Sequence, residues 1–335
     1  MAMRLFGHLP DGRAIHAHTL KSERVEATVL TYGGILQALL IDGLDVVCGY
    51  ESLEDYLSDT SHQGELIGRV ANRTKDGVFT MNGKTYTLAK NDNGKHHLHG
   101  GPLGFGRCVW TVEEADDAHI TLSLLSPDGD EGYPGNLFLK VTYTVLEDAI
   151  MIAYNAVCDE DTPVNLTNHS YFNLNGVDGG DVLGYRVQVH ADRITVVDDE
   201  LIPTGKRLSV EGTPYDFRTV HTFGERLDEH VRGYDTNFIF ANAPTGEIAD
   251  ISLKHVATFS SEKRTMEVYT DQPCAQIYTG NFLGGEPDFK GGVKREPLHA
   301  FCFETQSEPD ALRFGAEPLR KGELYHTVTV YRFPK

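Results

Sequence analysis

Residues 77–88 read Gly77-Val78-Phe79-Thr80-Met81-Asn82-Gly83-Lys84-Thr85-Tyr86-Thr87-Leu88, and this run predicts a β-hairpin. Its central Asn-Gly pair suits a type I′ turn, because both middle residues of that turn need positive φ. The two-residue loop places Phe79 opposite Tyr86 and Met81 opposite Lys84. The apolar side chains then share one face of the hairpin, and the threonines share the other.

Similar strand–turn–strand patterns recur along the chain. Residues 108–113 pair with 119–125 in one of them, and residues 137–146 pair with 150–157 in another. Helical periodicity is scarce, and only two segments, 53–57 and 223–231, each predict a short helix. Many short strands with few helices indicate an all-β fold, built as an antiparallel sandwich or barrel.

The length and composition suit one globular domain. No linker, low-complexity tract or fixed-period repeat divides the 335 residues, so we expect a single domain over residues 1–335. The 49 acidic and 30 basic residues give a formal net charge of −19. Such a charge repels phosphate backbones and argues against nucleic-acid binding, whereas neutral sugars remain compatible partners.

Cysteine usage and hydropathy favour a cytoplasmic location. The five cysteines are an odd number, are widely spaced and include no Cys-x-x-Cys pair: Cys48, Cys108, Cys158, Cys274 and Cys302. The first residues hold no apolar run long enough for a signal peptide, and no run reaches the roughly 18 residues of a membrane helix. We therefore expect neither export nor membrane insertion.

One apolar segment carries an unusual load of polar groups. It reads Val164-Asn165-Leu166-Thr167-Asn168-His169-Ser170-Tyr171-Phe172-Asn173-Leu174. Buried polar groups without partners cost roughly 1–3 kcal/mol each, so these groups must satisfy one another or face a polar ligand. His169 is the one group in the segment that exchanges a proton near neutral pH. Taken alone, it also fits a structural histidine in a polar network.

A second histidine-rich segment reads His96-His97-Leu98-His99-Gly100-Gly101. His-x-His on a strand points two imidazoles the same way, which suits a metal site. No carboxylate follows within a few residues, so we expect no bound metal. The glycines instead indicate a close approach of the backbone, with His99 held at its edge.

Acidic and basic side chains complete the candidate set. In residues 300–306 strand alternation puts Phe301 and Phe303 on one face and Cys302 and Glu304 on the other. A half-buried carboxylate there has a raised pKa, which suits a general base, although a buried Glu–Arg pair is an alternative. Asp235 fits either a turn former or a ligand contact, and residues 68–73 place two arginines and Asn72 together.

Together these segments resemble the aldose 1-epimerase (galactose mutarotase) family. The matching segments follow the family's order and span nearly the whole chain: residues 68–73, 98–101, 164–174, 202–205, 212–218, 276–281 and 304–306 with Pro309-Asp310. The resemblance implies a large antiparallel β supersandwich. It also implies an isomerase that interconverts the α and β anomers of free aldohexoses such as glucose and galactose, without a cofactor.

The resemblance assigns roles to individual residues. It implies that Glu304 is the general base for the anomeric hydroxyl and that His169 is the general acid for the ring oxygen, with His99 as a second active-site histidine. The residues that it places on the sugar hydroxyls are Asn72, Arg73, Asp235 and Gln276. Arg69 is the less favoured of the two arginines for sugar contact. Ser307-Glu308 depart from the residues that the family often carries there, which leaves the sugar preference open.

Three other functions fit parts of the pattern. A non-catalytic sugar-binding sandwich uses the same polar clusters without acid–base chemistry. A glycoside hydrolase uses Asp235 and Glu304 as a carboxylate pair. A hexose-6-phosphate epimerase needs a basic cluster for the phosphate, which these motifs lack. The sequence leaves the oligomeric state open between monomer and homodimer.

Overall fold

The structure is a computed structural model that describes residues 3–227 and 232–335. Its regular structure is nearly all β, and each pairing between its named strands is antiparallel, within hairpins and between distant strands alike. This confirms the predicted all-β antiparallel class. Most of the strands lie in three sheets of five, ten and six strands.

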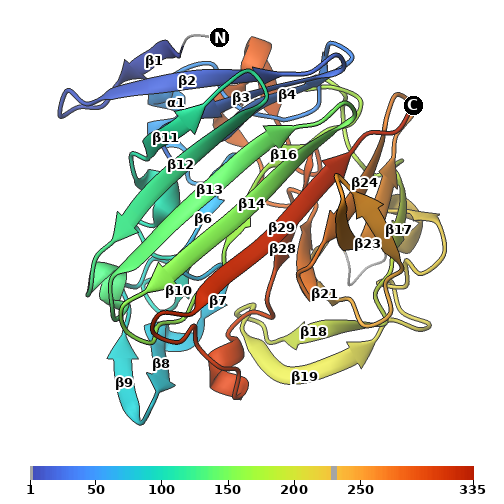
Figure 1. Cartoon of the computed structure of the whole chain (residues 1–335). Helices are drawn as coiled ribbons and strands as arrows, with labels where there is room; N and C mark the ends of the chain where they lie inside the picture. The colour runs from blue at the N-terminus through green and yellow to red at the C-terminus, as the bar shows by residue number, and fades with distance from the viewer. Residues whose placement is uncertain (1–2, 228–231) are drawn as a thin grey trace.

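The five-stranded sheet is formed by the first strands of the chain, in sequence order. Its members are β1 (Arg4–His8), β2 (Ala14–Lys21), β3 (Val25–Leu30), β4 (Leu36–Ile41) and β5 (Leu44–Asp45). The alternating burial along β2 buries one face of this sheet. In Figure 1 the sheet lies across the upper end of the molecule.

The ten-stranded sheet runs in the order β11-β12-β13-β14-β29-β24-β23-β17-β20, and β22 pairs with β23 beside this path. Its members are β11 (Thr111–Ala115), β12 (His119–Ser126), β13 (Leu137–Val145), β14 (Ala149–Cys158), β17 (Arg186–Val189), β20 (His221–Thr222), β22 (Thr245–Ile248), β23 (Ile251–Ser260), β24 (Thr265–Thr270) and β29 (Leu324–Arg332). Its centre joins distant parts of the chain, because β14 pairs with the last strand.

The six-stranded sheet carries the site described below and runs in the order β16-β28-β25-β21-β18-β19. Its members are β16 (Tyr171–Phe172), β18 (Arg193–Val197), β19 (Pro203–Ser209), β21 (Asp235–Ile239), β25 (Cys274–Tyr278) and β28 (Phe301–Gln306). Short strand pairs and helical turns connect the three large sheets.

Four two-stranded ladders and seven helical segments complete the described structure. The ladders are β6 (Leu66–Ile67) with β15 (Thr167–Asn168), β7 (Arg73–Thr74) with β10 (His97–Leu98), β8 (Val78–Met81) with β9 (Lys84–Thr87), and β26 (Gly285–Phe289) with β27 (Val293–Arg295). The helices are α1 (Leu53–Ser58) and the 3-10 turns η1 (Lys75–Gly77), η2 (Phe105–Arg107), η3 (Asp130–Gly132), η4 (Gly224–Arg226), η5 (Lys290–Gly292) and η6 (Ala311–Phe314).

The ten- and six-stranded sheets pack face to face through aromatic side chains. Phe259 of β23 lies 4.6 Å from Phe301 of β28, measured between ring centroids. The Tyr331 hydroxyl of β29 donates a hydrogen bond to the Phe303 carbonyl oxygen. Figure 1 shows β12, β13, β14 and β29 of the ten-stranded sheet as long diagonal strands. One core cluster therefore draws on all three large sheets.

The predicted hairpins are present. In β8–β9, Phe79 pairs with Tyr86 and Met81 with Lys84, as predicted. The hairpin β13–β14 also matches the predicted segments within one residue at each end. The strand predicted at 108–113 begins later, at Thr111, because Val109 bridges Tyr32 and the Trp110 N–H donates to Thr31.

Of the two predicted helices, the one at 53–57 is present as α1. The segment predicted at 223–231 contains the single 3-10 turn η4 in its described part, so the prediction of a helix there is wrong for residues 223–227. Residues 228–231 lie outside the described structure. The side chain of Phe223 is fully buried against the aromatic core, and this packing overrides the local helical pattern.

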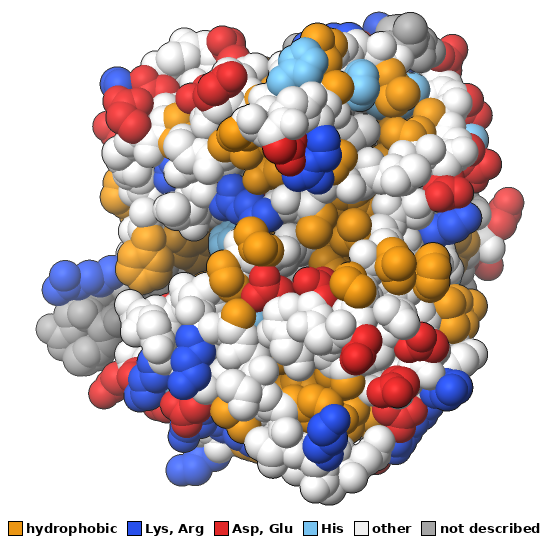
Figure 2. All heavy atoms as spheres, turned by 90° about the vertical axis from the view of Figure 1, so that its left-hand side faces the viewer, with side chains coloured by type: hydrophobic (Ala, Val, Ile, Leu, Met, Phe, Trp, Pro, Cys, Tyr) orange, Lys and Arg blue, Asp and Glu red, His pale blue; other side chains and the backbone are white. Residues whose placement is uncertain are grey.

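The exposed surface mixes charges of both signs. Figure 2 shows acidic and basic side chains interspersed with apolar ones over one face, without a continuous basic area on that face. Among the described residues, no helix is long and apolar enough to cross a membrane. The five cysteines are all free.

Candidate active site

Three neighbouring strands present the candidate carboxylates and amides on one face of the six-stranded sheet. Gln276 of β25 pairs with Glu304 of β28, and on its other side it pairs with Asn237 of β21. Asp235 lies two residues from Asn237 and therefore shares that face. The opposite face points Phe301 and Phe303 into the core, as the alternation predicted. Strand pairing alone thus brings these polar side chains together.

Glu304 and His169 form a buried acid–base pair at the centre of this face. His169 Nε2 lies 3.7 Å from Glu304 Oε1, and the two side chains are 7% and 2% exposed. Burial raises the pKa of Glu304 well above its ordinary value, and the nearby charge of Asp235 adds to this effect. Burial lowers the pKa of His169 to about 3. Glu304 Oε2 has no hydrogen-bond partner within the described protein, so it is free to accept from a ligand.

The amides around His169 fix its position, as their crowding in the sequence indicated. Asn168 donates from Nδ2 to the Gly64 carbonyl, and its Oδ1 accepts from both the N–H and the hydroxyl of Ser170. The His169 N–H donates to the Glu65 carbonyl at 2.9 Å. The thiol of Cys302 lies 3.5 Å from His169 Nδ1. The imidazole is therefore held with Nε2 toward Glu304.

His99 is held by a close backbone approach. A Cβ on Gly100 would lie 1.8 Å from the Gly68 carbonyl oxygen, so only glycine fits there. The Asn72 N–H donates to His99 Nδ1 at 3.2 Å, which places the ring proton on Nε2. His99 thus offers a hydrogen-bond donor at its free nitrogen.

His99, His169 and Glu304 form a cluster that could face either a metal ion or an oxygen atom, and the tautomer of His99 distinguishes the two. His99, His169 and Glu304 each place one ligand-type atom within 4.8 Å of the others, a donor set that a metal ion can use. A protonated Nε2 has no lone pair for a metal, and reversing the tautomer would break the bond from Asn72. The observed hydrogen bonding therefore favours donation to an oxygen atom.

The four predicted sugar-contacting residues lie in one hydrogen-bonded chain or beside it. Asn72 Nδ2 donates to Gln276 Oε1 at 3.2 Å, and Gln276 Nε2 donates to Asp235 Oδ1 at 2.6 Å. Arg73 is held by Asp92 at 2.9 Å. All four predicted residues line one hollow, together with Asn237 and Thr195. Burial raises the pKa of Asp235, whereas the charge of Arg73 lowers it.

Two histidines that the sequence analysis left unassigned lie outside the site. His97 donates from Nδ1 to the Ala89 carbonyl and accepts at Nε2 from the Tyr133 hydroxyl, each at 2.6 Å. Burial lowers its pKa to about 4. His96 accepts at Nδ1 from the Asp76 N–H. Both side chains therefore stabilise loops.

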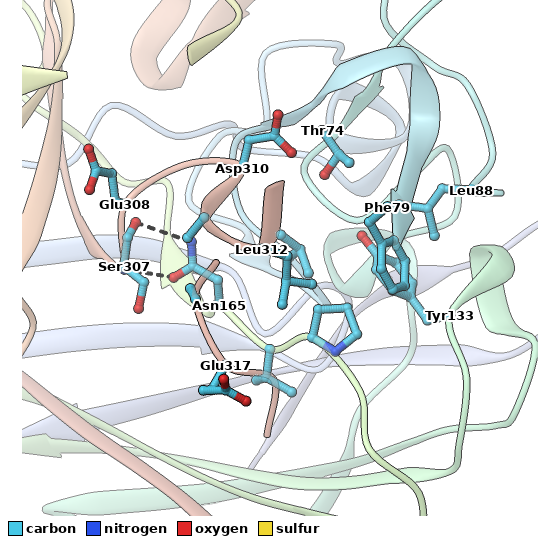
Figure 3. Close-up of a pocket in the computed structure, with 15 residues that line it drawn as sticks. Thr74, Phe79, Leu88, Tyr133, Asn165, Ser307, Glu308, Asp310, Leu312 and Glu317 are labelled. Atoms are coloured by element: carbon cyan, nitrogen blue, oxygen red, sulfur yellow. Dashed lines mark hydrogen bonds between the residues drawn. The ribbon is translucent and has the colours of Figure 1, made fainter. Parts of the chain in front are cut away.

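Ser307 and Glu308 directly follow β28 and line a second pocket. The backbone of Ser307 makes two hydrogen bonds with the side chain of Asn165, drawn as dashed lines in Figure 3. Glu308 accepts from the Thr195 hydroxyl and from Arg207, whose guanidinium lies at 2.6 Å. The pocket in Figure 3 has a volume of about 110 Å³ and is lined by none of the predicted site residues.

A third histidine, which the sequence patterns did not predict as a site residue, lies beside the pair. His62 lies 5.0 Å from His99 and 5.9 Å from His169, measured between ring centroids. Its Nδ1 is 2.8 Å from Glu65 Oε2. A His and a Glu three residues apart, directly before the arginine-rich segment at 68–73, were the available signal.

Comparisons with known proteins agree with this geometry. The model of the aldose 1-epimerase family matches residues 16–332. Galactose mutarotases from Bos taurus and Homo sapiens are each 39% identical to the chain, over 98% of it and 97% of the relative. An aldose 1-epimerase from Escherichia coli (strain K12) is 35% identical over 97% of the chain and 96% of its own length. The structure of a galactose 1-epimerase from Lactobacillus acidophilus superposes with a TM-score of 0.86 at 27% identity, covering 99% of this chain and 98% of that one.

Proposed function

Since the chain belongs to the aldose 1-epimerase family, we propose that its buried His169–Glu304 pair interconverts the α and β anomers of free aldohexoses such as glucose and galactose. The chain is an isomerase of the epimerase class. The observation that carries the residue assignment is the juxtaposition of a carboxylate and an imidazole within 3.7 Å, beside a row of amide and carboxylate groups. A hexose presents hydroxyls to such a row and two reacting oxygens to the pair.

In the proposed reaction, Glu304 removes the proton from the anomeric hydroxyl while His169 delivers a proton to the ring oxygen. The bond between C1 and the ring oxygen breaks, and C1 becomes an aldehyde carbon. Rotation about C1–C2 presents the other carbonyl face. Closure then returns one proton to His169 and takes the other from Glu304, so that no proton is consumed overall. The raised pKa of Glu304 suits a base that must also give its proton back.

The surrounding residues position the sugar in this proposal. His99 donates from Nε2 to an oxygen near the reacting centre. Asp235 accepts from sugar hydroxyls, and Arg73, braced by Asp92, donates to them. Asn72 and Gln276 occupy the space between Arg73 and Asp235. Each already makes a hydrogen bond to a neighbouring side chain, and each keeps a further donor or acceptor for the sugar. We further propose a cytoplasmic protein whose partner is the small-molecule sugar.

Polarimetry of fresh α-D-glucose and α-D-galactose tests the proposal. The protein should accelerate the decay of optical rotation above the rate in buffer. Glu304→Gln should lower kcat by about 10²- to 10⁴-fold, the usual contribution of one positioned acid or base. Glu296→Gln, at an exposed position before the same strand, is the matched control and should leave kcat unchanged.

Sugar binding separates catalysis from simple recognition. Calorimetric titration of the Glu304→Gln variant with galactose should still show binding, because the amides and Asp235 remain. Full activity in that variant would exclude Glu304 as the base. A wild-type protein that binds galactose without accelerating the rotation change would be a sugar-binding module.

A further inference from the structure

His62 is fixed in the wall of the site by a buried carboxylate. Its Nδ1 lies 2.8 Å from Glu65 Oε2, and its side chain is 20% exposed, compared with 3% for Glu65. Glu65 Oε1 in turn lies 3.4 Å from Arg107, which anchors it from the other side. The Arg107 guanidinium also donates to the carbonyls of Tyr56 and Asp59. The imidazole of His62 is therefore oriented through Nδ1, and its Nε2 is left available.

Three imidazoles form a triangle at this place. The ring centroids are 5.0 Å apart for His62 and His99, 5.9 Å for His62 and His169, and 5.3 Å for His99 and His169. His62 and His99 also line a common cavity of about 180 Å³. A sugar bound between His169 and Glu304 therefore has two further imidazoles beside it.

Only one of these three imidazoles has a carboxylate at hydrogen-bond distance in the described structure. His169 lies 3.7 Å from Glu304, and His99 accepts a backbone N–H at Nδ1. Burial lowers the pKa of both His99 and His169, and the charge of His62 is the next cause in each case. Glu65 therefore gives His62 a carboxylate partner at hydrogen-bond distance, which the other two rings lack among the described residues.

We propose that His62, oriented by Glu65, holds the catalytic proton between turnovers and passes it to His169 for delivery to the ring oxygen. This proposal rests on the proposed function. The proton moves to His169 and then to the ring oxygen as the C1–oxygen bond breaks, and it returns by the same route on closure. His62 is thus a positioning residue that acts through His169.

The charged environment supports this placement. The titratable and charged groups around the imidazole triangle are Asp59, Glu65, Arg73, His97, His99, Arg107, His169, Tyr171, Tyr278, Cys302 and Glu304. Asp59 is already bonded to the Tyr50 hydroxyl and paired with Arg295. Arg73 is paired with Asp92 at 2.9 Å, and its positive charge lowers the pKa of His99. Glu65 is thus the carboxylate that contacts His62 directly.

The test is the pH dependence of kcat and KM for His62→Gln, measured by polarimetry with α-D-galactose. His119→Gln is the matched control, because His119, at the start of β12 in the ten-stranded sheet, likewise has a carboxylate partner, Asp116, at 2.9 Å. Without His62, the proton must reside on His169, whose pKa is lowered by burial. Each pKa unit by which His169 lies below the working pH lowers its protonated fraction about tenfold. We therefore expect kcat at pH 7.5 to fall at least about tenfold, with KM changed less than about twofold.

The pH profile distinguishes this role from a structural one. The activity of His62→Gln relative to wild type should rise as the pH falls toward 5, and Glu65→Gln should shift the profile in the same direction. Thermal melting identifies any variant that fails to fold. A ¹⁵N NMR titration of the histidine rings in the wild-type protein then tests the proposal without a variant. Of the three rings, His62 should be the protonated one at pH 6.

The possible results separate the two proposals. Unchanged kcat and an unchanged profile in folded His62→Gln, an increase in KM alone, or a neutral His62 ring at pH 6 would each overturn the role of His62. These results leave the proposed function intact if wild type is active and Glu304→Gln is not. If the wild-type protein itself gives no acceleration, the proposed function fails, and this inference fails with it.

Discussion

Two arginines four residues apart, Arg69 and Arg73, have different surroundings. The Arg69 guanidinium is buried and donates to the Pro134 and Gly135 carbonyls and to the Thr162 hydroxyl. Replacing it with Met leaves these acceptors unpaired, at about 1–3 kcal/mol each. We expect Arg69→Met to lower the free energy of unfolding by about 3–5 kcal/mol.

Arg73→Met is the matched comparison for this prediction. The Arg73 side chain is 17% exposed and pairs with the single carboxylate of Asp92, so its loss should cost about 1–2 kcal/mol of stability, less than the loss of Arg69. Its effect should appear instead as a raised KM for galactose. Urea unfolding and polarimetry measure the two quantities, and equal stability losses in the two variants would contradict the distinction.

The site residues were predictable from sequence to the extent that strand alternation and family motifs govern them. The structure brings Glu304, His169 and His99 within 4.8 Å of one another and places the four sugar-contacting candidates beside them. His62 was not predicted, because its importance depends on the approach of the His99 loop, which no local pattern specifies. The roles of all these residues remain predictions until the variants are measured.

Among the elements, hairpins followed the sequence most closely, because a turn and its flanking alternation are local properties. The β8–β9 register matches the prediction residue by residue. Residues 108–110 departed from it because distant segments supply their partners: Val109 bridges Tyr32, and Trp110 donates to Thr31. Long-range pairing thus overrode the local strand pattern.

The turn of β8–β9 gives a prediction about backbone conformation. Gly83 has a φ of +74°, and a Cβ there would meet no heavy atom within 4 Å. Gly83→Ala should therefore cost only the left-handed backbone strain, about 1–2 kcal/mol. Galactose turnover should not change, because the hairpin contributes no residue to the site.

Gly184→Ala is the control for the turn. Gly184 also has open space around it, but its φ lies outside the left-handed region. Alanine there should leave stability unchanged or raise it slightly, because it restricts the unfolded chain. Urea denaturation of both variants tests the difference, and an equal effect at the two glycines would show that backbone conformation is not the cause.

At the level of the whole molecule, the fold class was predictable but the order of strands was not. Strand β14 pairs with β29, which joins Ala149 to Arg332, and β16 pairs with β28, which joins Tyr171 to Cys302. Such pairings depend on side-chain packing between segments far apart in sequence. We propose that the chain is one domain, because a single core cluster contains residues of all three large sheets.

The stability of the whole molecule should depend on pH through Asp310, a buried acid in the pocket of Figure 3. Burial raises its pKa from 3.8 to about 6, although the charge of Arg313 opposes the shift. The folded protein therefore binds this proton more tightly than the unfolded chain. The stability contribution of Asp310 is fully present below about pH 4 and is lost as the pH rises through 6.

Asp310→Asn removes this titration while keeping the shape of the side chain, and asparagine tolerates the left-handed backbone at this position. The free energy of unfolding of the variant, relative to wild type, should increase by about 2 kcal/mol between pH 4.5 and pH 8, because most of the shift from 3.8 to about 6 falls in this range and each pKa unit corresponds to about 1.4 kcal/mol. Buried histidines such as His97 titrate in both proteins, so their contribution cancels in the difference. Urea unfolding at the two pH values measures this difference in the free energy of unfolding, and Glu23→Gln, at an exposed position, is the control. A difference that stays the same at both pH values would mean that the Asp310 carboxyl is not destabilised by its burial.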